Sequence, residues 1–294
     1  MLVVGDHSAP VLALSFAPNG LRIVSGGKDG TARVWSIGGG PATVLSGHTD
    51  SVTAVAYSQD GGWIATGSAD RSVRLWPAAG GAAETLRDLH DAAVTAVTFF
   101  HGGRLLATAC GNRIDAGVSG GVRLWRVEDR KEMRVRGEPH GVWALAATQA
   151  DKTLAWAGGG KRATVWDITA QDHILLPTHR IGVLAIAISA DGRMLAATDD
   201  WAIRVYDTKS RQELATLNGH KGRVCALAFA PDGATLLSAG WDKRVTMWDV
   251  ASGRERRTYA WPIGRPRVVT FSPDGLLAAV AGDAGMVVVW DVEA

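Results

Sequence analysis

The chain has 294 residues, of which 47% are hydrophobic and 20% charged, the balance of an ordinary globular protein. Its 31 basic and 29 acidic residues give a net charge of +2, which is no argument for nucleic acid or an anionic membrane as the main partner. The 36 glycines and 12 tryptophans are unusual, and so many glycines with only 10 prolines indicate many tight turns rather than disorder.

Three further features concern the compartment in which the protein works and its relation to membranes. Cys110 and Cys225 match no metal or redox spacing, so we expect a reducing, cytoplasmic setting. The first ten residues lack a basic region followed by an apolar core, so we expect no signal peptide. The longest apolar runs, such as residues 183–188, have the length of a strand and fall far short of a membrane span.

Strand-like segments that end in an aromatic residue recur along the whole chain. Their last residues are 41, 49, 41, 40, 42 and 42 positions apart, and one insertion of about eight residues in the third unit accounts for the exception. Seven units of roughly 42 residues therefore cover nearly the whole chain. In chain order the segments are TARVW (31–35), SVRLW (72–76), GVRLW (121–125), ATVW (163–166), AIRVY (202–206), RVTMW (244–248) and MVVVW (286–290).

Each unit has the pattern of several β-strands. In the sixth unit, VCALAF (224–229) suits a strand buried on both faces, and PDG (231–233) predicts a turn. ATLLSAG (234–240) and RVTMW predict two more strands, and a variable fourth strand follows each tryptophan, as in ELATL (213–217) of the fifth unit. No segment has the pattern of a long amphipathic helix. Four antiparallel strands per unit predict an all-β fold, a single seven-bladed β-propeller over residues 1–294.

The two ends of the sequence predict how the ring closes. The last unit stops at WDVEA, directly after a third strand, so its own outer strand is missing. Residues 2–4 stand where an outer strand is expected, just before the first histidine, and we expect them to complete the last blade. This pairing would leave no long sheet edge open.

The units also carry the short motifs of a known family. Gly-His pairs occur at 47–48 and 219–220, and Trp-Asp pairs occur at 166–167, 248–249 and 290–291. Four aspartates lie six residues before a closing aromatic, at positions 29, 70, 200 and 242. With seven units in register, the sequence resembles the WD-repeat β-propellers over essentially its full length.

The resemblance implies a hydrogen-bonded network of a histidine, a serine or threonine, an aspartate and a tryptophan within a blade. The physical reason is that a buried indole N–H needs an acceptor and a buried aspartate needs donors. By position, the implied networks are His7, Ser25, Asp29 and Trp35 in unit 1; His48, Thr66, Asp70 and Trp76 in unit 2; and His220, Ser238, Asp242 and Trp248 in unit 6.

The other four units depart from this pattern. Unit 3 keeps the histidine, threonine and tryptophan, but its insertion displaces the aspartate. We expect no complete network in these four units, which packing must hold together. Unit 5 keeps His179 and Asp200 but closes with Tyr206. The other departures are Glu138 at the histidine position of unit 4 and Pro262 at the histidine position of unit 7.

Several side chains are candidates for contact with a partner. Trp241 and Trp201 are expected in loops between second and third strands, on the face where this family commonly binds peptides, although each could instead pack against a neighbouring blade. The insertion of unit 3 extends the same kind of loop and either contacts a partner or is inert. The remaining candidates are Asn112, Arg113 and Asp115 of the insertion, and Lys28, Arg71, Lys243, Arg223 and Arg265.

The resemblance implies a non-catalytic scaffold for a protein or peptide partner, without a cofactor, nucleic acid or membrane. It would be a monomeric ring, stand-alone or part of a larger regulatory protein. The alternative is a propeller enzyme, a hydrolase or a lactonase-like metal enzyme, with its site at the mouth of the central channel. Such a site needs acidic or histidine side chains from several blades. The residues just before the expected inner strands are Pro10, Ser51, Ala93, Gly141, Gly182, Arg223 and Arg265, which argues against a central metal.

Overall fold

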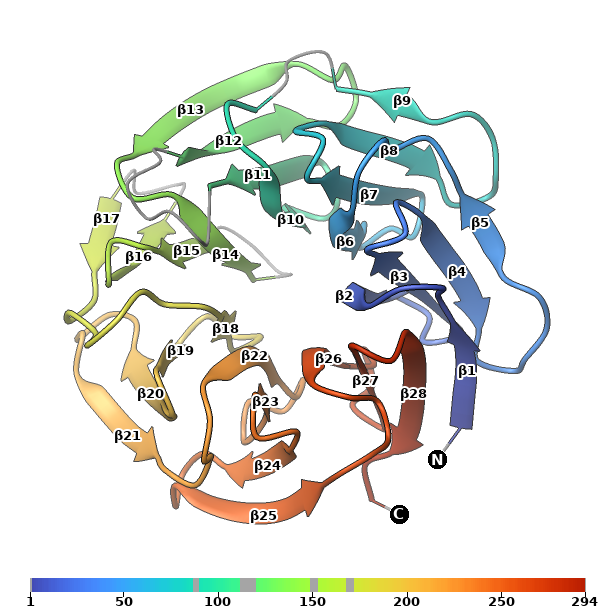
Figure 1. The fold of residues 1–294 in the computed structure, drawn as a ribbon. Helices are drawn as coiled ribbons and strands as arrows, with labels where there is room; N and C mark the ends of the chain where they lie inside the picture. The colour runs from blue at the N-terminus through green and yellow to red at the C-terminus, as the bar shows by residue number, and fades with distance from the viewer. Residues whose placement is uncertain (1, 87–89, 112–119, 149–152, 168–171, 294) are drawn as a thin grey trace.

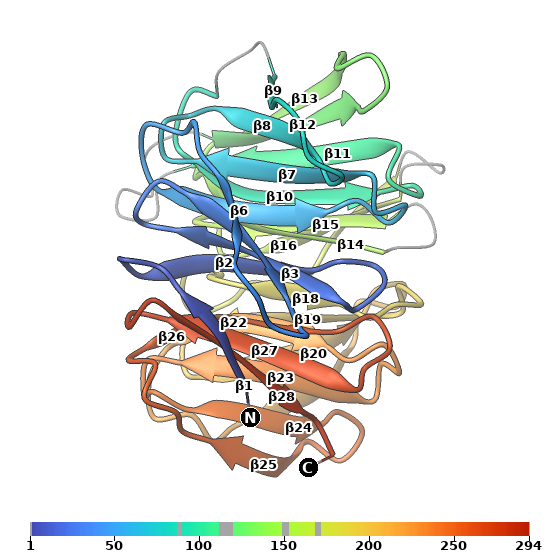
Figure 2. The ribbon, with the colours of Figure 1, turned by 90° about the vertical axis from the view of Figure 1, so that its right-hand side faces the viewer.

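The computed structural model describes residues 2–86, 90–111, 120–148, 153–167 and 172–293. These residues form seven four-stranded antiparallel sheets arranged in a ring, which Figure 1 shows along the axis of the ring and Figure 2 from the side. None of the residues described is helical, so none belongs to a helix that could span a membrane. The predicted all-β, seven-bladed propeller is therefore confirmed.

The first four blades are meanders whose strands run from the axis to the rim in chain order (Figure 1). Blade 1 contains β2 (Val11–Phe16), β3 (Arg22–Gly27), β4 (Ala32–Ser36) and β5 (Thr43–Leu45). Blade 2 contains β6 (Val52–Tyr57), β7 (Trp63–Ser68), β8 (Val73–Pro77) and β9 (Glu84–Thr85). Blade 3 contains β10 (Val94–Phe100), β11 (Leu105–Cys110), β12 (Gly120–Arg126) and β13 (Glu132–Glu138). Blade 4 contains β14 (Val142–Ala147), β15 (Thr153–Gly158), β16 (Ala163–Asp167) and β17 (Asp172–Leu175).

The last three blades continue this order, and the final one takes its outer strand from the beginning of the chain. Blade 5 contains β18 (Ile186–Ile188), β19 (Met194–Asp199), β20 (Ala202–Asp207) and β21 (Glu213–Leu217). Blade 6 contains β22 (Val224–Phe229), β23 (Thr235–Gly240), β24 (Val245–Asp249) and β25 (Arg254–Tyr259). Blade 7 contains β26 (Pro266–Phe271), β27 (Leu277–Gly282), β28 (Met286–Asp291) and the outer strand β1 (Leu2–Asp6).

The composition of each strand follows its distance from the axis. The second strand of blade 6, β23 (TLLSAG), is buried at every position because neighbouring blades cover both of its faces. The outer strand β25 (RERRTY) is exposed over its first four residues because it forms the rim. In this blade the buried second strand is therefore mainly apolar, while the exposed outer strand is strongly polar.

The hydrophobic core is divided among the contacts between blades. Seven clusters of buried residues are found, one at each interface between neighbouring blades. The closing aromatic of each third strand packs against the preceding blade: Trp248 lies in the cluster between blades 5 and 6, and Trp290 in the one between blades 6 and 7. The repeated aromatic thus joins blades as well as ending a strand.

The ring closes where β1 pairs with β28 in the antiparallel sense, and both ends of the chain lie side by side there (Figures 1 and 2). Leu2 is opposite Val289 and Asp6 is opposite Met286. A Cβ at Gly5 would lie 2.0 Å from the Trp35 ring, so only glycine allows β1 to run this close to blade 1. The predicted closure is confirmed.

The inner strand of blade 5 is shorter than its sequence suggests. The apolar run at 183–188 has the length of a full strand, yet only Ile186–Ile188 forms β18. The Thr198 hydroxyl accepts hydrogen bonds from the backbone N–H groups of Leu184 (2.9 Å) and Ala185 (3.2 Å). A side chain from the neighbouring strand thus replaces the first part of the ladder.

Candidate functional site

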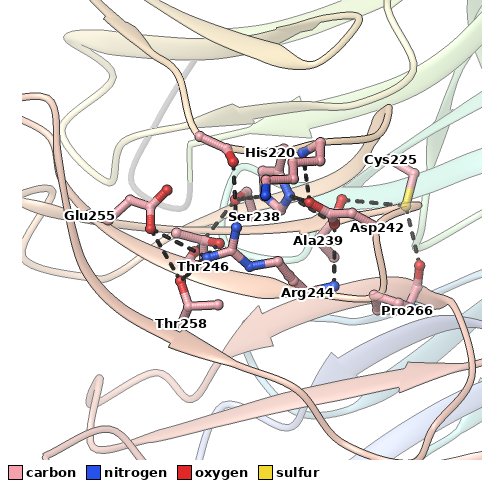
Figure 3. Close-up of polar contacts among 12 residues, drawn as sticks. His220, Cys225, Ser238, Ala239, Asp242, Arg244, Thr246, Glu255, Thr258 and Pro266 are labelled. Carbon is pink, nitrogen blue, oxygen red and sulfur yellow. Dashed lines mark hydrogen bonds and ion pairs between the residues drawn. The ribbon is translucent and has the colours of Figure 1, made fainter.

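Blade 6 contains a continuous network of four side chains, of which Figure 3 labels His220, Ser238 and Asp242. The His220 ring lies between Asp242 (Nδ1 to carboxylate oxygen, 3.0 Å) and Ser238 (Nε2 to Oγ, 2.7 Å). The Trp248 indole N–H donates to the same Ser238 oxygen at 2.8 Å. An ionised carboxylate only accepts, so Nδ1 carries the proton, Nε2 accepts from the serine hydroxyl, and the hydroxyl oxygen accepts from the indole.

Blades 1 and 2 repeat this geometry. His7 Nε2 lies 2.7 Å from Ser25 Oγ, which accepts from Trp35 at 2.8 Å, and His48 Nε2 lies 2.7 Å from Thr66 Oγ1. The remaining contacts are Trp76 to Thr66 (3.0 Å), His7 to Asp29 (3.0 Å) and His48 to Asp70 (2.9 Å). The structure therefore brings together all twelve side chains that the resemblance implied, in three separate blades.

Burial sets the protonation states in these networks. Desolvation lowers the pKa of His7 and His48 and outweighs the opposing attraction of their aspartates, which leaves both rings neutral at pH 7. Burial alone would raise the pKa of Asp29 and Asp242, but hydrogen bonds from backbone and side-chain donors and the nearby histidine bring each pKa below its ordinary value. The hydrogen-bond directions described above also require a neutral histidine beside an ionised carboxylate.

Among its described residues, blade 3 forms the same network from a histidine, a threonine and a tryptophan, without an aspartate. His90 Nε2 lies 2.9 Å from Thr108 Oγ1, which also accepts from the Trp125 indole at 2.9 Å. The other ring nitrogen of His90, Nδ1, is buried and has no hydrogen-bond partner among the described residues. Three of the four groups therefore form hydrogen bonds in blade 3, so packing is not the only interaction that holds this blade together.

We expect this isolated histidine to make the protein sensitive to acid. Burial lowers the pKa of His90 to about 4, while an unfolded chain takes up the proton near 6.5. The neutral ring therefore stabilises the fold above pH 6.5, and that stability is lost as the pH falls from 6.5 towards 4. Urea unfolding at pH 7.5 and 4.5 should show wild type losing about 2 kcal/mol more than His90→Gln. Parallel losses in the two proteins would contradict this assignment.

Blade 4 uses a different pair of side chains. Trp156 occupies the serine or threonine position of β15, and its indole N–H donates to Glu138, which replaces the histidine, at 2.9 Å. Arg136 contacts Glu138 at 3.3 Å, and its guanidinium carbon lies 5.2 Å from the centre of the Trp156 ring. Of this pair, only Glu138 stands out in the sequence, at the histidine position of the unit. The sequence signal for this contact was a pair of replacements. Trp156, a hydrogen-bond donor, stands at the serine or threonine position, and Glu138, an acceptor, stands at the histidine position.

Blades 5 and 7 have weaker substitutes. In blade 5, the Tyr206 hydroxyl lies 3.4 Å from His179 Nε2, and Asp199 rather than Asp200 is buried beneath the hairpin, where it accepts from the Arg180 backbone N–H at 2.7 Å. In blade 7, the Trp290 ring packs against Trp261 at 4.5 Å between centres. The expectation that these blades lack a complete network agrees with these contacts.

The upper face is the face that carries the hairpins between second and third strands and the turns before the inner strands. Its most exposed aromatic residues are Trp201 and Trp241, which are 57% and 45% exposed. The Trp241 backbone N–H donates to the Arg223 carbonyl at 2.9 Å, which ties the hairpin of blade 6 to the turn before β22. The Trp241 side chain is therefore fixed at its base and open to solvent at its ring.

Two arginines from neighbouring blades flank this ring. The guanidinium carbons of Arg223, in blade 6, and Arg265, in blade 7, lie 5.6 Å and 6.0 Å from the centre of the Trp241 ring. Both distances fall within the range of cation–π attraction. Arg223 also pairs with Asp200 of blade 5 at 3.1 Å, directly beside Trp201. We call Arg223, Trp241 and Arg265 the Trp241 cluster.

The other candidate residues are more scattered. Lys243 lies in the same hairpin as Trp241, whereas Lys28 and Arg71 are exposed in blades 1 and 2. Asn112, Arg113 and Asp115 lie outside the described residues. Within the described ranges, no three histidine, cysteine, aspartate or glutamate side chains gather as a possible metal site.

Comparison with known proteins places the repeats in one family. The profile of the WD domain, G-beta repeat, matches residues 2–36, 39–77, 172–207 and 211–249, together just over half of the chain. An uncharacterized WD repeat-containing protein, sll1491, from Synechocystis sp. is 33% identical over 104 residues, 35% of this chain and 30% of that protein. Transcription initiation factor TFIID subunit 5 from Caenorhabditis elegans is 25% identical over 152 residues, 51% and 22% of the two chains.

A third relative has a similar likeness. Guanine nucleotide-binding protein subunit beta-like protein 1 from Mus musculus is 31% identical over 129 residues, 41% of this chain and 38% of that protein. The matched parts thus cover well under half the length of these relatives. The matches of the repeat profile include blades 1, 2 and 6, the blades with complete networks.

Proposed function

The chain belongs to the WD-repeat family, and from that premise we propose that it is a non-catalytic module that binds a protein or peptide partner through its upper face. The observation that supports this most directly is the Trp241 cluster. An indole that is 45% exposed lies there within 5.6 Å and 6.0 Å of the guanidinium carbons of two arginines from different blades. Tryptophan and arginine are the residues that most often dominate the energy of protein interfaces.

The framework beneath the cluster favours binding at low entropic cost. Gly222 lies so close to the hairpin that a Cβ there would come within 2.8 Å of the Asp242 backbone nitrogen. Asp242 in turn belongs to the network that joins the turn before β22 to the β23–β24 hairpin. A surface held in this way loses little conformational freedom when a partner docks.

The alternative of a propeller enzyme has less support. Two of the seven positions at which it needs acidic or histidine side chains are Arg223 and Arg265, and both flank Trp241 instead. Two of the relatives carry the word subunit in their names, which supports a role in assemblies. These observations favour binding over catalysis on this face.

Replacement of Trp241 by alanine tests the proposal. The purified wild-type chain, immobilised and incubated with lysate of its source, should retain a partner that Trp241→Ala loses, because the exposed ring supplies contact area. The melting temperature of the variant should stay within about 3 °C of wild type, since exposed positions rarely affect stability. Leu214→Ala on the rim, where the leucine is 53% exposed, is the matched control and should retain the partner. Equal retention by Trp241→Ala, or a melting temperature many degrees lower, would contradict the proposal.

We also propose that the module works as a monomer in the reducing environment of the cytoplasm. Cys110 is a buried free thiol, which supports a reducing compartment. The pairing of β1 with β28 uses the chain's own strand to close the ring, which supports a self-sufficient monomer. Sedimentation equilibrium should give the 30.9 kDa mass of one chain, and a larger mass at micromolar concentration would contradict the monomer.

A further inference from the structure

The Trp241 cluster offers hydrogen-bond donors whose acceptors are missing from the described part of the chain. The Arg265 guanidinium is exposed and forms no hydrogen bond or ion pair with any described residue. Arg223 uses its Nε to reach Asp200, which leaves its two terminal amino groups without a described partner. The Trp241 indole N–H also has no acceptor among these residues. All three groups donate, so a ligand that completes them must accept.

The charges around the cluster point to the same kind of ligand. Lys221 and Lys243 are exposed beside it and take part in no ion pair within the described chain. The nearby carboxylates are already engaged: Asp200 binds Arg223 at 3.1 Å, and Asp283 binds Arg267 at 2.6 Å. Positive charge therefore remains unbalanced at this part of the upper face, which favours an anionic group over a neutral acceptor.

The backbone holds both arginines ready for such a group. Each follows a glycine, and each has its carbonyl oxygen bound by the hairpin beside it, from Trp241 N–H to Arg223 at 2.9 Å and from Asp283 N–H to Arg265 at 3.0 Å. Gly264 has a φ of +72°, a conformation that other residues adopt only with strain. A guanidinium beside an indole keeps its N–H edge free, and that edge matches a carboxylate or phosphate in a bidentate manner.

We infer that the Trp241 cluster binds a peptide segment through an anionic side chain, a carboxylate or a phosphate, at the boundary between blades 6 and 7. This inference rests on the proposed function and specifies the chemistry of its partner. Arg223 and Arg265 bind the anion from two sides, and the open part of the Trp241 ring covers the neighbouring portion of the peptide.

An array of short peptides with a fixed central residue and randomised flanks tests the inference. The central residue is glutamate, phosphoserine, serine or lysine, and the array is probed with the labelled full chain. The glutamate and phosphoserine series should give at least tenfold more binding than the serine and lysine series. Preference between the first two series distinguishes a carboxylate source from a phosphate source, and both preferences support the inference.

Variants of the full chain then identify the groups that bind the anion. For the strongest peptide from the array, measured by fluorescence anisotropy, Arg223→Gln and Arg265→Gln should each raise Kd about tenfold, because each removes a hydrogen bond to a charged group. Arg254→Gln is the matched control, since Arg254 is exposed on the rim strand of the same blade, and its Kd should stay within about twofold. Arg265→Glu should abolish preference for the anionic series. All variants are compared only after their melting temperatures are shown to equal that of wild type.

The outcomes separate this inference from the proposed function. Binding that depends on Trp241 but is equal across the four series would overturn the anionic inference and leave the binding module standing. The same holds if Arg254→Gln weakens binding as much as Arg265→Gln. If no series binds while Trp241→Ala still loses a protein partner in the retention experiment, the peptide inference is also wrong. Failure of both experiments would remove the proposed function itself.

Discussion

Deletion of residues 2–6 should lower the free energy of unfolding by about 4 kcal/mol, because four residue pairs of the β1–β28 ladder are lost at roughly 1 kcal/mol each. The contact of Gly5 with the Trp35 ring disappears with the same strand. The unpaired edge of β28 would also expose a template for aggregation. Urea unfolding of the deletion variant beside wild type measures the loss.

The control for this deletion lies within the same strand. Val3 is 43% exposed, so Val3→Ala removes a side chain from β1 while keeping its backbone pairing, and it should change stability by less than about 0.5 kcal/mol. Gly5→Ala should be clearly destabilising, because the added methyl meets the Trp35 ring. An unchanged urea midpoint for the deletion would show that β1 does not close the ring.

Substitution of Ser238 by alanine should destabilise the protein by about 2–4 kcal/mol, because two buried polar groups lose their partner at about 1–2 kcal/mol each. These groups are the Trp248 indole N–H and His220 Nε2, at 2.8 Å and 2.7 Å from the serine oxygen. The measurement is equilibrium unfolding in urea, with the melting temperature as a second readout. A variant as stable as wild type would mean that the network contributes no net stability.

Threonine at the same position provides the matched comparison. Thr66 and Thr108 perform the same task in blades 2 and 3, where each accepts from an indole at 3.0 Å and 2.9 Å. Ser238→Thr retains the hydroxyl and should therefore keep most of the stability that Ser238→Ala loses. Equal losses in both variants would assign the effect to packing rather than to hydrogen bonding.

Most of the fold could be predicted because each blade is built from local hairpins with regular turn spacing. The expected strands at 224–229 and 213–217 coincide with β22 and β21. The short β18 could not be predicted, because its first residues bond to the hydroxyl of Thr198 on the next strand. Periodicity reports which residues are buried, but it cannot report which side chains replace backbone partners.

The three complete networks could be placed from the sequence because their members stand at fixed distances within a repeat. The positions that sequence reasoning missed follow from changes in that spacing or chemistry. In blade 5, the serine equivalent Ala197 lies only nine residues before Tyr206, compared with ten residues between Ser25 and Trp35, so the buried aspartate is Asp199. Asp200 instead has a φ of +65° and turns outward to Arg223.

The Trp241 cluster was only partly predictable. The sequence marks Trp241, Arg223 and Arg265 individually as candidates, since each stands in a loop or turn on the same face. It does not show that Arg265 of the next blade reaches the same indole at 6.0 Å. Contacts between blades depend on the direction of the side chains at the boundary. The spacing of the repeats does not specify that direction.

The unequal hydrogen bonding of the blades divides the ring into two arcs. Blades 6, 1 and 2 carry complete networks and flank the closure in blade 7, whereas blades 3, 4 and 5 are contiguous and each lacks part of the network. In a repeat architecture, local opening follows the weakest neighbouring units. Backbone amides of blades 3 to 5 should therefore exchange with solvent deuterium through partial opening, while those of blades 1, 2 and 6 exchange more slowly. The Trp241 cluster lies at the boundary between blades 6 and 7, outside the arc of blades 3 to 5, so partial opening of that arc would leave the cluster intact.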